Sequence, residues 1–134
     1  MAQQALDLEG MLYTTEHEWV LVQEGGVAKI GITNYAQAQL GEIVFFDLPK
    51  LGTYIRQGIK MGEVESVKTI TDIFSPVTGQ ILEVNKDISL QPDLVNKDAE
   101  GRGWLVKSTY EPKDLGNLMS HSQYQQFIAN LPHQ

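Results

Sequence analysis

The sequence predicts a mainly β protein, a sandwich or barrel that carries short attached helices. Two observations lead to this prediction. Short runs rich in β-branched and aromatic residues recur along the chain, and turns that contain glycine separate them at close intervals. The chain has 134 residues, which suits one domain and leaves no room for a separate catalytic domain. We therefore expect a single domain over residues 1–134.

The first strong signal is a β-hairpin followed by a short helix. Residues 19–22 and 27–32 favour strands, and the glycines within residues 23–26 can supply the positive φ of a tight turn. Thr33 has a side-chain oxygen that can cap a helix, and Gly41 is a suitable stop. We therefore expect a helix between these two residues.

The middle of the chain contains further strand signals. Residues 43–48 are an apolar run ended by Pro49, and we expect them to form a buried strand. Shorter β-like runs follow as far as Gly62. After a turn signal at residues 75–79, residues 80–85 favour another strand.

The C-terminal third combines short helices with one last strong strand. Pro92 can open a helix through Asn96, and residues 104–107 are a β-rich run after a loop. Ser120 can cap a terminal helix at about 120–130, whose apolar residues fall on one face. We expect three large residues to be buried in the core: Leu48, Val84 and Trp104.

Composition and charge exclude several classes of protein. The chain has 10 basic and 17 acidic side chains, for a net charge of -7. We therefore expect no nucleic-acid binding, because that affinity depends on neutralising phosphates. The absence of cysteine excludes disulfides, iron–sulfur clusters, thiolate zinc sites and a cysteine nucleophile. No apolar run is long enough to cross a membrane.

We expect no metal site either. Three histidines provide few ligands. His17 stands between Glu16 and Glu18, but neighbouring strand residues point to opposite faces, so the three side chains do not converge.

The first ten residues lack the features of a targeting segment. They contain no basic region before an apolar core, as in a signal peptide, and they have acids but no arginine, unlike a mitochondrial transit peptide. We therefore expect a cytoplasmic bacterial protein. A mitochondrial location would require this chain to be the mature form of an organelle protein.

Residues 63–74 are twelve β-favouring residues without glycine or proline. Strands usually run for about 3–10 residues, so one continuous strand of this length is possible but long. If the chain folds back, residues 66–69 are the least apolar place for the turn, and Lys68 then lies at the tip of a hairpin. The pair Val67-Lys68 lacks the Asn-Gly signature of a tight turn, so both readings stay open. Taken alone, Lys68 reads much more readily as a solvated strand lysine than as a functional residue.

Residues 65–73, followed by residues 75–79, resemble the lipoyl-attachment signature of the glycine cleavage system H-protein family. The sequence Glu65-Ser66-Val67-Lys68-Thr69 favours this family over biotinyl carriers, which usually have Met-Lys-Met, and over acyltransferase lipoyl domains, which often have Asp-Lys-Ala. Other blocks are similar to the family in the same order, and residues 13–20 resemble its opening strand. These further blocks are residues 31–37, 40–44, 94–96 and 103–105.

The resemblance implies a flattened β-barrel, or barrel-sandwich hybrid, of the biotinyl/lipoyl-carrier type, with short peripheral helices and a C-terminal helix. It also implies a lipoyl hairpin at about 61–75 and lipoate attached through an amide to Lys68. A lysine amine with an ordinary pKa is almost wholly protonated at neutral pH. The modifying enzyme must therefore supply a base, and the resemblance implies that the chain is a carrier rather than an enzyme.

The resemblance further implies a set of partners. In this family the lipoyl arm takes the aminomethyl group of glycine at a pyridoxal-phosphate glycine decarboxylase. A tetrahydrofolate-dependent aminomethyltransferase receives the one-carbon unit, and a dihydrolipoamide dehydrogenase reoxidises the arm. A lipoate ligase or a lipoyl/octanoyl transferase modifies Lys68. We expect the carrier to be a monomer.

Family members shelter the loaded arm in a cleft, and Glu18 and Asp72 match acidic positions there. A solvated strand carboxylate explains both acids equally well. Two positions depart from the family pattern: Tyr35 stands where members can have His, and Ala99-Glu100 replaces a common Pro-Tyr pair.

Two other classes of function need to be weighed. A lipoyl relay or sulfur-transfer carrier would use the same Lys68. A small free-standing enzyme finds no support, because the chain offers no Ser/His/Asp set, phosphate-binding glycine loop or metal cluster.

Overall fold

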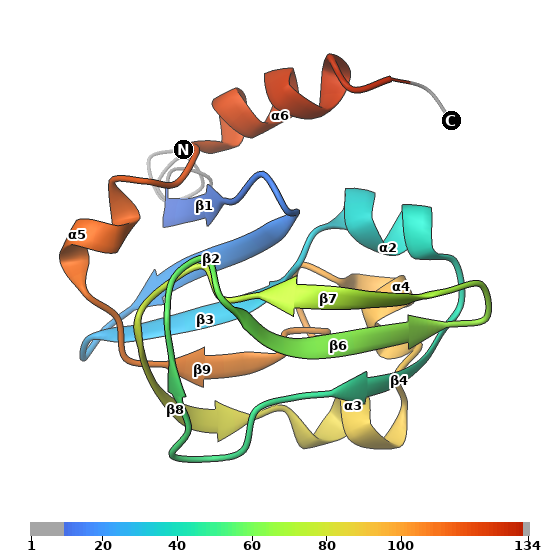
Figure 1. Cartoon of the computed structure of the whole chain (residues 1–134), viewed down its shortest axis with the longest axis horizontal. Helices are drawn as coiled ribbons and strands as arrows, with labels where there is room; N and C mark the ends of the chain where they lie inside the picture. Colours follow the sequence, from blue (N-terminus) through green and yellow to red (C-terminus); the bar gives the residue numbers. More distant parts are fainter. Residues whose placement is uncertain (1–9, 133–134) are drawn as a thin grey trace.

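The computed structural model describes residues 10–132, which form two β-sheets with short helices around them (Figure 1). The larger sheet has the order β1 (Met11–Tyr13), β2 (Glu18–Gln23), β3 (Val27–Ile32), β9 (Val106–Ser108), β8 (Gly79–Val84) and β5 (Tyr54–Ile55). The smaller sheet has the order β4 (Ile43–Asp47), β6 (Lys60–Ser66) and β7 (Ile70–Phe74). The helices are α2 (Asn34–Leu40), α3 (Lys86–Leu90), α4 (Leu94–Asp98), α5 (Pro112–Leu115) and α6 (His121–Ala129).

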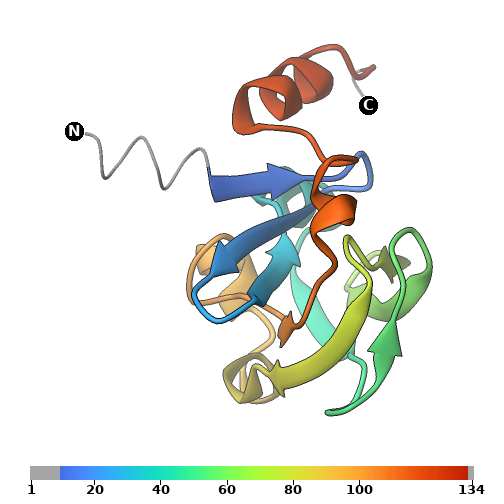
Figure 2. The same cartoon turned by 90° about the vertical axis from the view of Figure 1, so that its left-hand side faces the viewer.

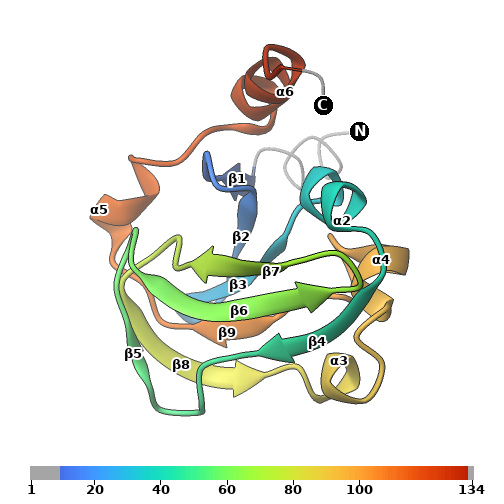
Figure 3. The ribbon, with the colours of Figure 1, turned by 45° about the vertical axis from the view of Figure 1, so that its right-hand side comes forward.

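The core lies between the two sheets, which face each other in Figure 3. Buried side chains of both sheets belong to one apolar cluster, including Val20, Ile30 and Val106 from the larger sheet and Ile43, Val64 and Ile73 from the smaller one. Full burial of such a side chain contributes about 1.5–3 kcal/mol to folding. The predicted mainly β sandwich or barrel fold is therefore confirmed.

The predicted hairpin of β2 and β3 is confirmed, with antiparallel pairing along its whole length. Gly25 and Gly26 have φ values of 81° and 74°, as the turn requires. Opposite Trp19, a Cβ on Gly31 would lie only 2.5 Å from the indole ring. Glycine therefore lets the tryptophan lie flat across β3, and the indole Nε1 donates to the carbonyl of Ala99 at 3.1 Å.

Helix α2 is also as predicted. The Oγ1 atom of Thr33 accepts a hydrogen bond from the backbone N–H of Ala36 at 3.2 Å, as an N-cap does. The helix stops at Gly41, whose φ of 79° favours glycine.

The opening segment differs from the prediction of one strand over residues 13–20. Two strands, β1 and β2, pair with each other around a tight turn. The Oγ1 atom of Thr14 accepts from the backbone N–H groups of Glu16 and Glu18, and His17 has a φ of 72°. These hydrogen bonds to the Thr14 side chain stabilise a local turn, and the turn interrupts the strand.

The short helices were only partly predicted. Helix α4 begins two residues later than expected, because the carbonyl of Pro92 accepts from Val95 in a turn that precedes the helix. Sequence reasoning missed α3, although Asn85 is an N-cap that accepts from the N–H of Asp87 at 3.0 Å. It also missed α5, which begins with Pro112.

The prediction of a buried strand at residues 43–48 was wrong for part of that run. Strand β4 lies at the edge of the smaller sheet, and its register shifts between Ile43 and Phe45. Ile43 is buried, whereas Val44 and Phe45 are exposed on the outer face. An edge strand that covers the core with only one face leaves its other face in solvent.

The predicted core positions Leu48, Val84 and Trp104 are half-buried rather than buried. Leu48 and Val84 pack against the core from its margin. Trp104 precedes β9 instead of beginning it, and the Nζ atoms of Lys29 and Lys107 lie 5.9 and 5.1 Å from its ring centroid. Cation–π contacts of this kind hold an indole at a surface.

The predicted C-terminal helix is present as α6. Ser120 and Gln123 form a reciprocal capping box at its start. The ring of Tyr124 is buried and stacks on that of Tyr13 with centroids 4.5 Å apart. Figure 2 shows α6 lying over β1 at one end of the sheets.

Candidate functional site

Strands β6 and β7 form an antiparallel hairpin, so the chain folds back within residues 63–74 instead of forming one long strand. Glu65 pairs with Ile70, and the N–H of Ser66 donates to the carbonyl of Thr69 at 2.8 Å. Lys68 therefore lies at the tip. In Figures 1 and 3 the tip lies beside the connection between α2 and β4.

The buried hydroxyl of Ser66 holds the turn in place of an Asn-Gly pair. It accepts from the N–H groups of Lys68 at 3.1 Å and Thr69 at 3.2 Å. The N–H of Val67 donates to the carbonyl of Glu42 at 2.9 Å, which ties the tip to the segment after α2. Sequence reasoning missed this role of Ser66, although side-chain hydrogen bonds from serine to the backbone are a known turn signal.

The side chain of Lys68 is exposed and lies over Gly41. A Cβ built on Gly41 would lie 3.3 Å from Cε of Lys68, so glycine leaves room for the lysine stem. Within residues 10–132, no carboxylate lies within ion-pair distance of the lysine Nζ. The amine is exposed to solvent on a turn that hydrogen bonds hold in place, so it is accessible to a modifying enzyme.

A cleft of about 600 Å³ runs along β7, between this strand, α2 and the turn before β2. It begins near the tip at Ile70 and extends to Phe74. Its walls include the three residues that the sequence singled out for a cleft: Glu18, Tyr35 and Asp72.

Glu18 is buried in the wall of the cleft and is held from two sides. Its Oε1 accepts from the hydroxyl of Thr14 at 2.6 Å, and its Oε2 accepts from the N–H of Phe74 at 3.1 Å. Burial raises the pKa of Glu18 to about 7, against the opposing effect of these two hydrogen bonds. The carboxyl group therefore joins the turn before β2 to the end of β7.

Asp72 is in a different setting. Its side chain is about half exposed, and Oδ1 lies 3.2 Å from Nζ of Lys60. The same Nζ lies 2.6 Å from Oε2 of Glu63. Asp72 is therefore a rim residue with its own counter-ion, whereas Glu18 has no counter-ion within residues 10–132.

Tyr35 and His17 lie together in the cleft wall, with ring centroids 4.7 Å apart. The hydroxyl of Tyr124 lies 2.9 Å from Nδ1 of His17 and 2.7 Å from Oγ1 of Thr33. Burial lowers the pKa of His17, which favours the neutral ring in this network. Helix α6 therefore supports the cleft through one buried hydroxyl.

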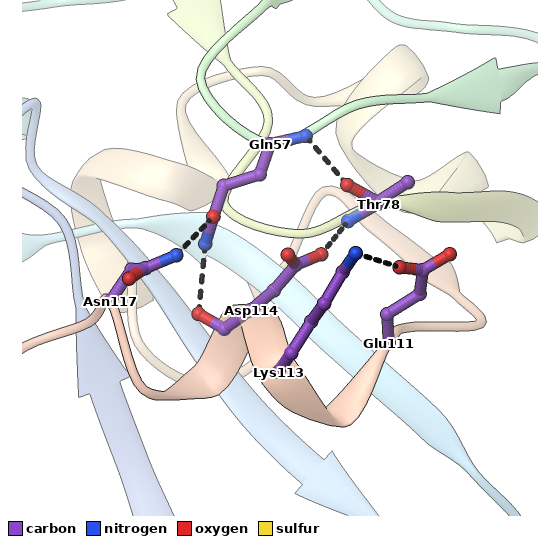
Figure 4. A network of polar contacts seen from close by, with 6 residues as sticks. All are labelled: Gln57, Thr78, Glu111, Lys113, Asp114 and Asn117. Atoms are coloured by element: carbon purple, nitrogen blue, oxygen red, sulfur yellow. Dashed lines mark hydrogen bonds and ion pairs between the residues drawn. The ribbon is translucent and has the colours of Figure 1, made fainter.

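A second cavity of about 320 Å³ continues from Glu18 and Phe74 towards Asn117. Beside it lies the polar network of Figure 4. The buried carboxylate of Asp114 accepts from the N–H of Thr78 at 2.7 Å, and Gln57 Nε2 donates to the Asp114 carbonyl at 2.9 Å. Asn117 in turn donates to Gln57 Oε1 at 2.8 Å. The network ties the loop before β6 and the turn before β8 to α5, which fixes the end of the hairpin away from its tip.

Comparison with known proteins identifies the family of this chain. The family model described as glycine cleavage H-protein matches residues 11–131. The chain belongs to the glycine cleavage H-protein family. The glycine cleavage system H protein of Bradyrhizobium diazoefficiens is 46% identical over 119 residues, which cover 88% of this chain and 97% of that protein. The protein of the same description from Thermotoga maritima is 43% identical over 118 residues, covering 87% and 94% of the two chains.

The three-dimensional structure agrees with this membership. A crystal structure of a glycine cleavage system H protein from Mycobacterium marinum superposes with a TM-score of 0.83 and 35% sequence identity. It covers 90% of this chain and 98% of the other. The expected barrel-sandwich fold of the H-protein family is thereby confirmed.

The departures from the family pattern have defined places in the fold. Tyr35 faces His17 in the cleft wall. Ala99 is buried beneath Trp19, and a carboxylate oxygen of Glu100 accepts from the N–H of Asn34 at 2.9 Å, at the start of α2. Glu100 therefore supplies an acceptor for a free backbone donor at a helix start.

Two kinds of feature are absent from residues 10–132. No three His, Asp or Glu side chains are grouped closely enough to hold a metal ion. No helix has the length and apolar character needed to cross a membrane. Residues 1–9, which carry the prediction about targeting, and His133, one of the three histidines, lie outside the described residues.

Proposed function

We propose that this chain is the lipoyl carrier of the glycine cleavage system, with lipoate attached through an amide to Lys68. The observation that carries the proposal is the position of Lys68, which is exposed at the tip of a hairpin and lies beside a cleft. The chain that presents this lysine is a member of the H-protein family. These residues suit a lipoyl group, because the tip leaves the amine accessible and the cleft offers about 600 Å³ next to it.

In this role the chain shuttles the aminomethyl group of glycine from the pyridoxal-phosphate glycine decarboxylase to the tetrahydrofolate-dependent aminomethyltransferase. Bound lipoate supplies the disulfide and thiol chemistry, and the protein supplies position and shelter. Lys68 anchors the arm, Ser66 holds the tip, and the hydrogen bonds of Glu18 keep the cleft wall closed against β7. The chain then acts as a carrier subunit without a reaction of its own.

Glu18 and Asp72 are proposed to favour a cationic amine in the cleft. A protonated amine beside a carboxylate gains attraction, and this gain grows where water is excluded. The buried Glu18 is better placed for this than Asp72, which already pairs with Lys60 at the rim.

The proposed partners follow from the same role. They are the glycine decarboxylase, the aminomethyltransferase, a dihydrolipoamide dehydrogenase and a lipoate ligase or lipoyl/octanoyl transferase. We propose that the carrier is a monomer in the bacterial cytoplasm, in keeping with the bacterial relatives reported above.

A lipoyl relay or sulfur-transfer carrier would also use Lys68. The relatives reported above are described as H proteins of the glycine cleavage system, which favours glycine cleavage over a relay. Reconstitution distinguishes the two roles. The lipoylated chain with the decarboxylase, the aminomethyltransferase and the dehydrogenase should support glycine-dependent release of carbon dioxide, and a relay protein should not.

The attachment site is tested by incubating the apo chain with lipoate, ATP and a lipoate ligase, followed by intact-mass analysis and peptide mapping. We expect one lipoyl group, on Lys68. Lys68→Arg should accept none, because a guanidinium stays charged and offers no amine nucleophile. Modification at Lys29 or Lys107, or modification that persists in Lys68→Ala, would overturn the assignment.

A further inference from the structure

The side-chain amide of Asn96 holds the connection between α2 and β4. Asn96 belongs to α4, and the two residues that precede it in this helix are buried in the core, so its backbone has a fixed place. Its Oδ1 accepts from the N–H of Ile43 at 2.9 Å, and its Nδ2 donates to the carbonyl of Gly41 at 2.8 Å. The amide therefore binds the backbone on both sides of Glu42.

A third hydrogen bond fixes the amide itself. Nδ2 of Asn96 also donates to Oε1 of Gln37, on α2, at 2.9 Å. The oxygen and the two N–H bonds of the amide thus each have a partner. Figure 3 shows α4, α2 and the hairpin tip on the same side of the molecule. Asn96 therefore joins three elements beside the tip: α4, α2 and the start of β4.

The hydrogen bond to Ile43 reaches the hairpin tip through a single peptide group. The N–H of Ile43 and the carbonyl of Glu42 belong to the same peptide, which is planar and trans, so the two groups point in opposite directions. Asn96 holds the N–H on one side, and this directs the carbonyl to the other. There the carbonyl accepts from the N–H of Val67 at 2.9 Å. Val67 directly precedes Lys68.

We propose that Asn96 is a positioning residue of the carrier: it sets the place of the hairpin tip relative to α2, and so directs the arm on Lys68 into the cleft. The inference rests on the proposed attachment of lipoate to Lys68. Helix α2 lines the cleft, and the cleft begins near the tip at Ile70. One side chain therefore fixes both the anchor of the arm and one wall of the space that receives it.

The place of the anchor decides how often the arm occupies the cleft. A tethered group reaches a nearby site at an effective concentration that depends on the span between anchor and site. If the tip moves away from α2, the same arm enters the cleft less often, and a loaded arm spends more time in water. Asn96 is not among the residues that line the cleft, so it acts through the backbone that it holds.

The chain offers a matched control in Asn85. Its Oδ1 accepts from the N–H of Asp87 at 3.0 Å, and its Nδ2 donates to the carbonyls of Arg102 at 3.0 Å and Trp104 at 2.7 Å. This amide also makes three hydrogen bonds, but they join the start of α3 to the segment before β9. Removing it should destabilise the fold without releasing the tip.

The first measurement is amide hydrogen exchange at Val67 in the apo chain, which needs no lipoate. We expect Asn96→Ala to speed this exchange about tenfold, because the peptide that binds Val67 is no longer held from its other side. Asn85→Ala should leave it near the wild-type rate. Gln37→Ala should do the same, since it removes only the contact to α2 and keeps both backbone hydrogen bonds of Asn96. Urea midpoints measure the stability that each variant loses.

The second measurement is the lifetime of the aminomethyl group on the loaded carrier, without partner enzymes. Asn96→Ala should shorten this lifetime by roughly threefold or more, because the arm leaves the cleft more often. Asn85→Ala should match the wild type, although its urea midpoint also falls. The comparison separates the placement of the arm from a general loss of stability.

Three results would overturn the proposal. The first is an unchanged exchange rate at Val67 in Asn96→Ala, or a faster exchange with an unchanged lifetime. The second is an equal shortening of the lifetime in Asn96→Ala and Asn85→Ala, because stability alone would then explain it. The third is an exchange rate in Gln37→Ala as fast as in Asn96→Ala, which would mean that the tip is held through α2 and not through the peptide.

Failure of the proposed function is distinguishable from these results. A wild-type chain that accepts no lipoate at Lys68 would reject the carrier role. The exchange rates at Val67 would still be measured, because they are properties of the apo chain.

Discussion

The hydroxyl of Tyr124 lies 2.7 Å from Oγ1 of Thr33, so the C-terminal helix α6 contacts the residue that caps α2. The same hydroxyl lies 2.9 Å from Nδ1 of His17, which stands with Tyr35 in the cleft wall. One side chain, distant in sequence from all of these, therefore connects three parts of the site.

Tyr124→Phe should destabilise the fold, because it leaves the buried Thr33 hydroxyl without a side-chain partner. We expect a loss of about 1–3 kcal/mol in the free energy of unfolding. Urea denaturation measures it, and Tyr54→Phe, at an exposed position, is the control. In a double-mutant cycle with Thr33→Val, the two losses should be clearly less than additive. Additive losses would show that the two hydroxyls do not act together.

Glu18 should make folding stability depend on pH. Burial raises its pKa from 4.5 to about 7, so the folded state holds the proton more tightly than the unfolded chain. Stability from this group is fully present below pH 4.5 and is lost as pH rises to about 7, by on the order of 3 kcal/mol. Removing the ionisation with Glu18→Gln should abolish this loss.

The measurement is the difference in unfolding free energy between the wild type and Glu18→Gln at a series of pH values. The wild type should weaken relative to the variant as pH rises through this window. Glu24→Gln, which changes an exposed carboxylate in the turn between β2 and β3, should keep the wild-type slope. A difference that stays constant with pH would contradict the prediction.

The loaded carrier should lose its aminomethyl group faster in Glu18→Gln and Asp72→Asn. Lipoylation of Lys68 should stay nearly unchanged, since neither acid contacts the tip turn. We expect the larger effect from Glu18→Gln, because Asp72 is half exposed and shared with Lys60. The decay of the loaded protein without partner enzymes gives the rates. Lifetimes equal to that of the wild type, with the fold intact, would reject both acids as protective groups.

The Lys68 side chain should contribute little to stability. Lys68→Ala changes an exposed residue, so we expect a shift within about 0.5 kcal/mol. Ile73→Ala removes a fully buried side chain between the sheets and should cost about 2–5 kcal/mol. Trp104→Ala should fall between these values, because the ring is half-buried. Urea midpoints provide the comparison, and a loss in Lys68→Ala as large as in Ile73→Ala would make the lysine structural.

Local signals in the sequence predicted local structure well. Thr33 and Ser120 act as caps at the predicted helix starts, and the two glycines of the β2–β3 turn have positive φ. These features depend on residues a few positions apart, so they can be read along the chain. Phe45 shows the limit, since its apolar character suggested burial while its place on an edge strand leaves it exposed.

The cleft could not be derived in the same way. Glu18 accepts from Phe74, and Tyr124 contacts His17, across 56 and 107 positions of sequence. Such contacts depend on how the two sheets and α6 come together. The resemblance to the H-protein family indicated Glu18 and Asp72. Only the structure shows that Glu18 is buried and that Asp72 forms an ion pair with Lys60.

Ser66→Ala should loosen the hairpin tip and slow the attachment of lipoate. The substitution removes the acceptor of the N–H groups of Lys68 and Thr69 while the backbone contacts from Ser66 to Thr69 and from Val67 to Glu42 remain. We therefore expect the hairpin to persist, with a stability loss of about 1–2 kcal/mol. Lys68 would then sample more orientations, and productive approach to the acyl donor would become rarer.

Lipoylation kinetics with a lipoate ligase should show a several-fold lower kcat/KM for Ser66→Ala, and amide hydrogen exchange at Lys68 and Thr69 should be faster. Ser122→Ala, at an exposed position in α6, is the control and should match the wild type in both measurements. Ser66→Thr keeps a hydroxyl and should restore part of the rate, because the lost function is that of a hydrogen-bond acceptor. Faster exchange with an unchanged rate would mean that the ligase itself orders the tip and that the serine serves only the free carrier.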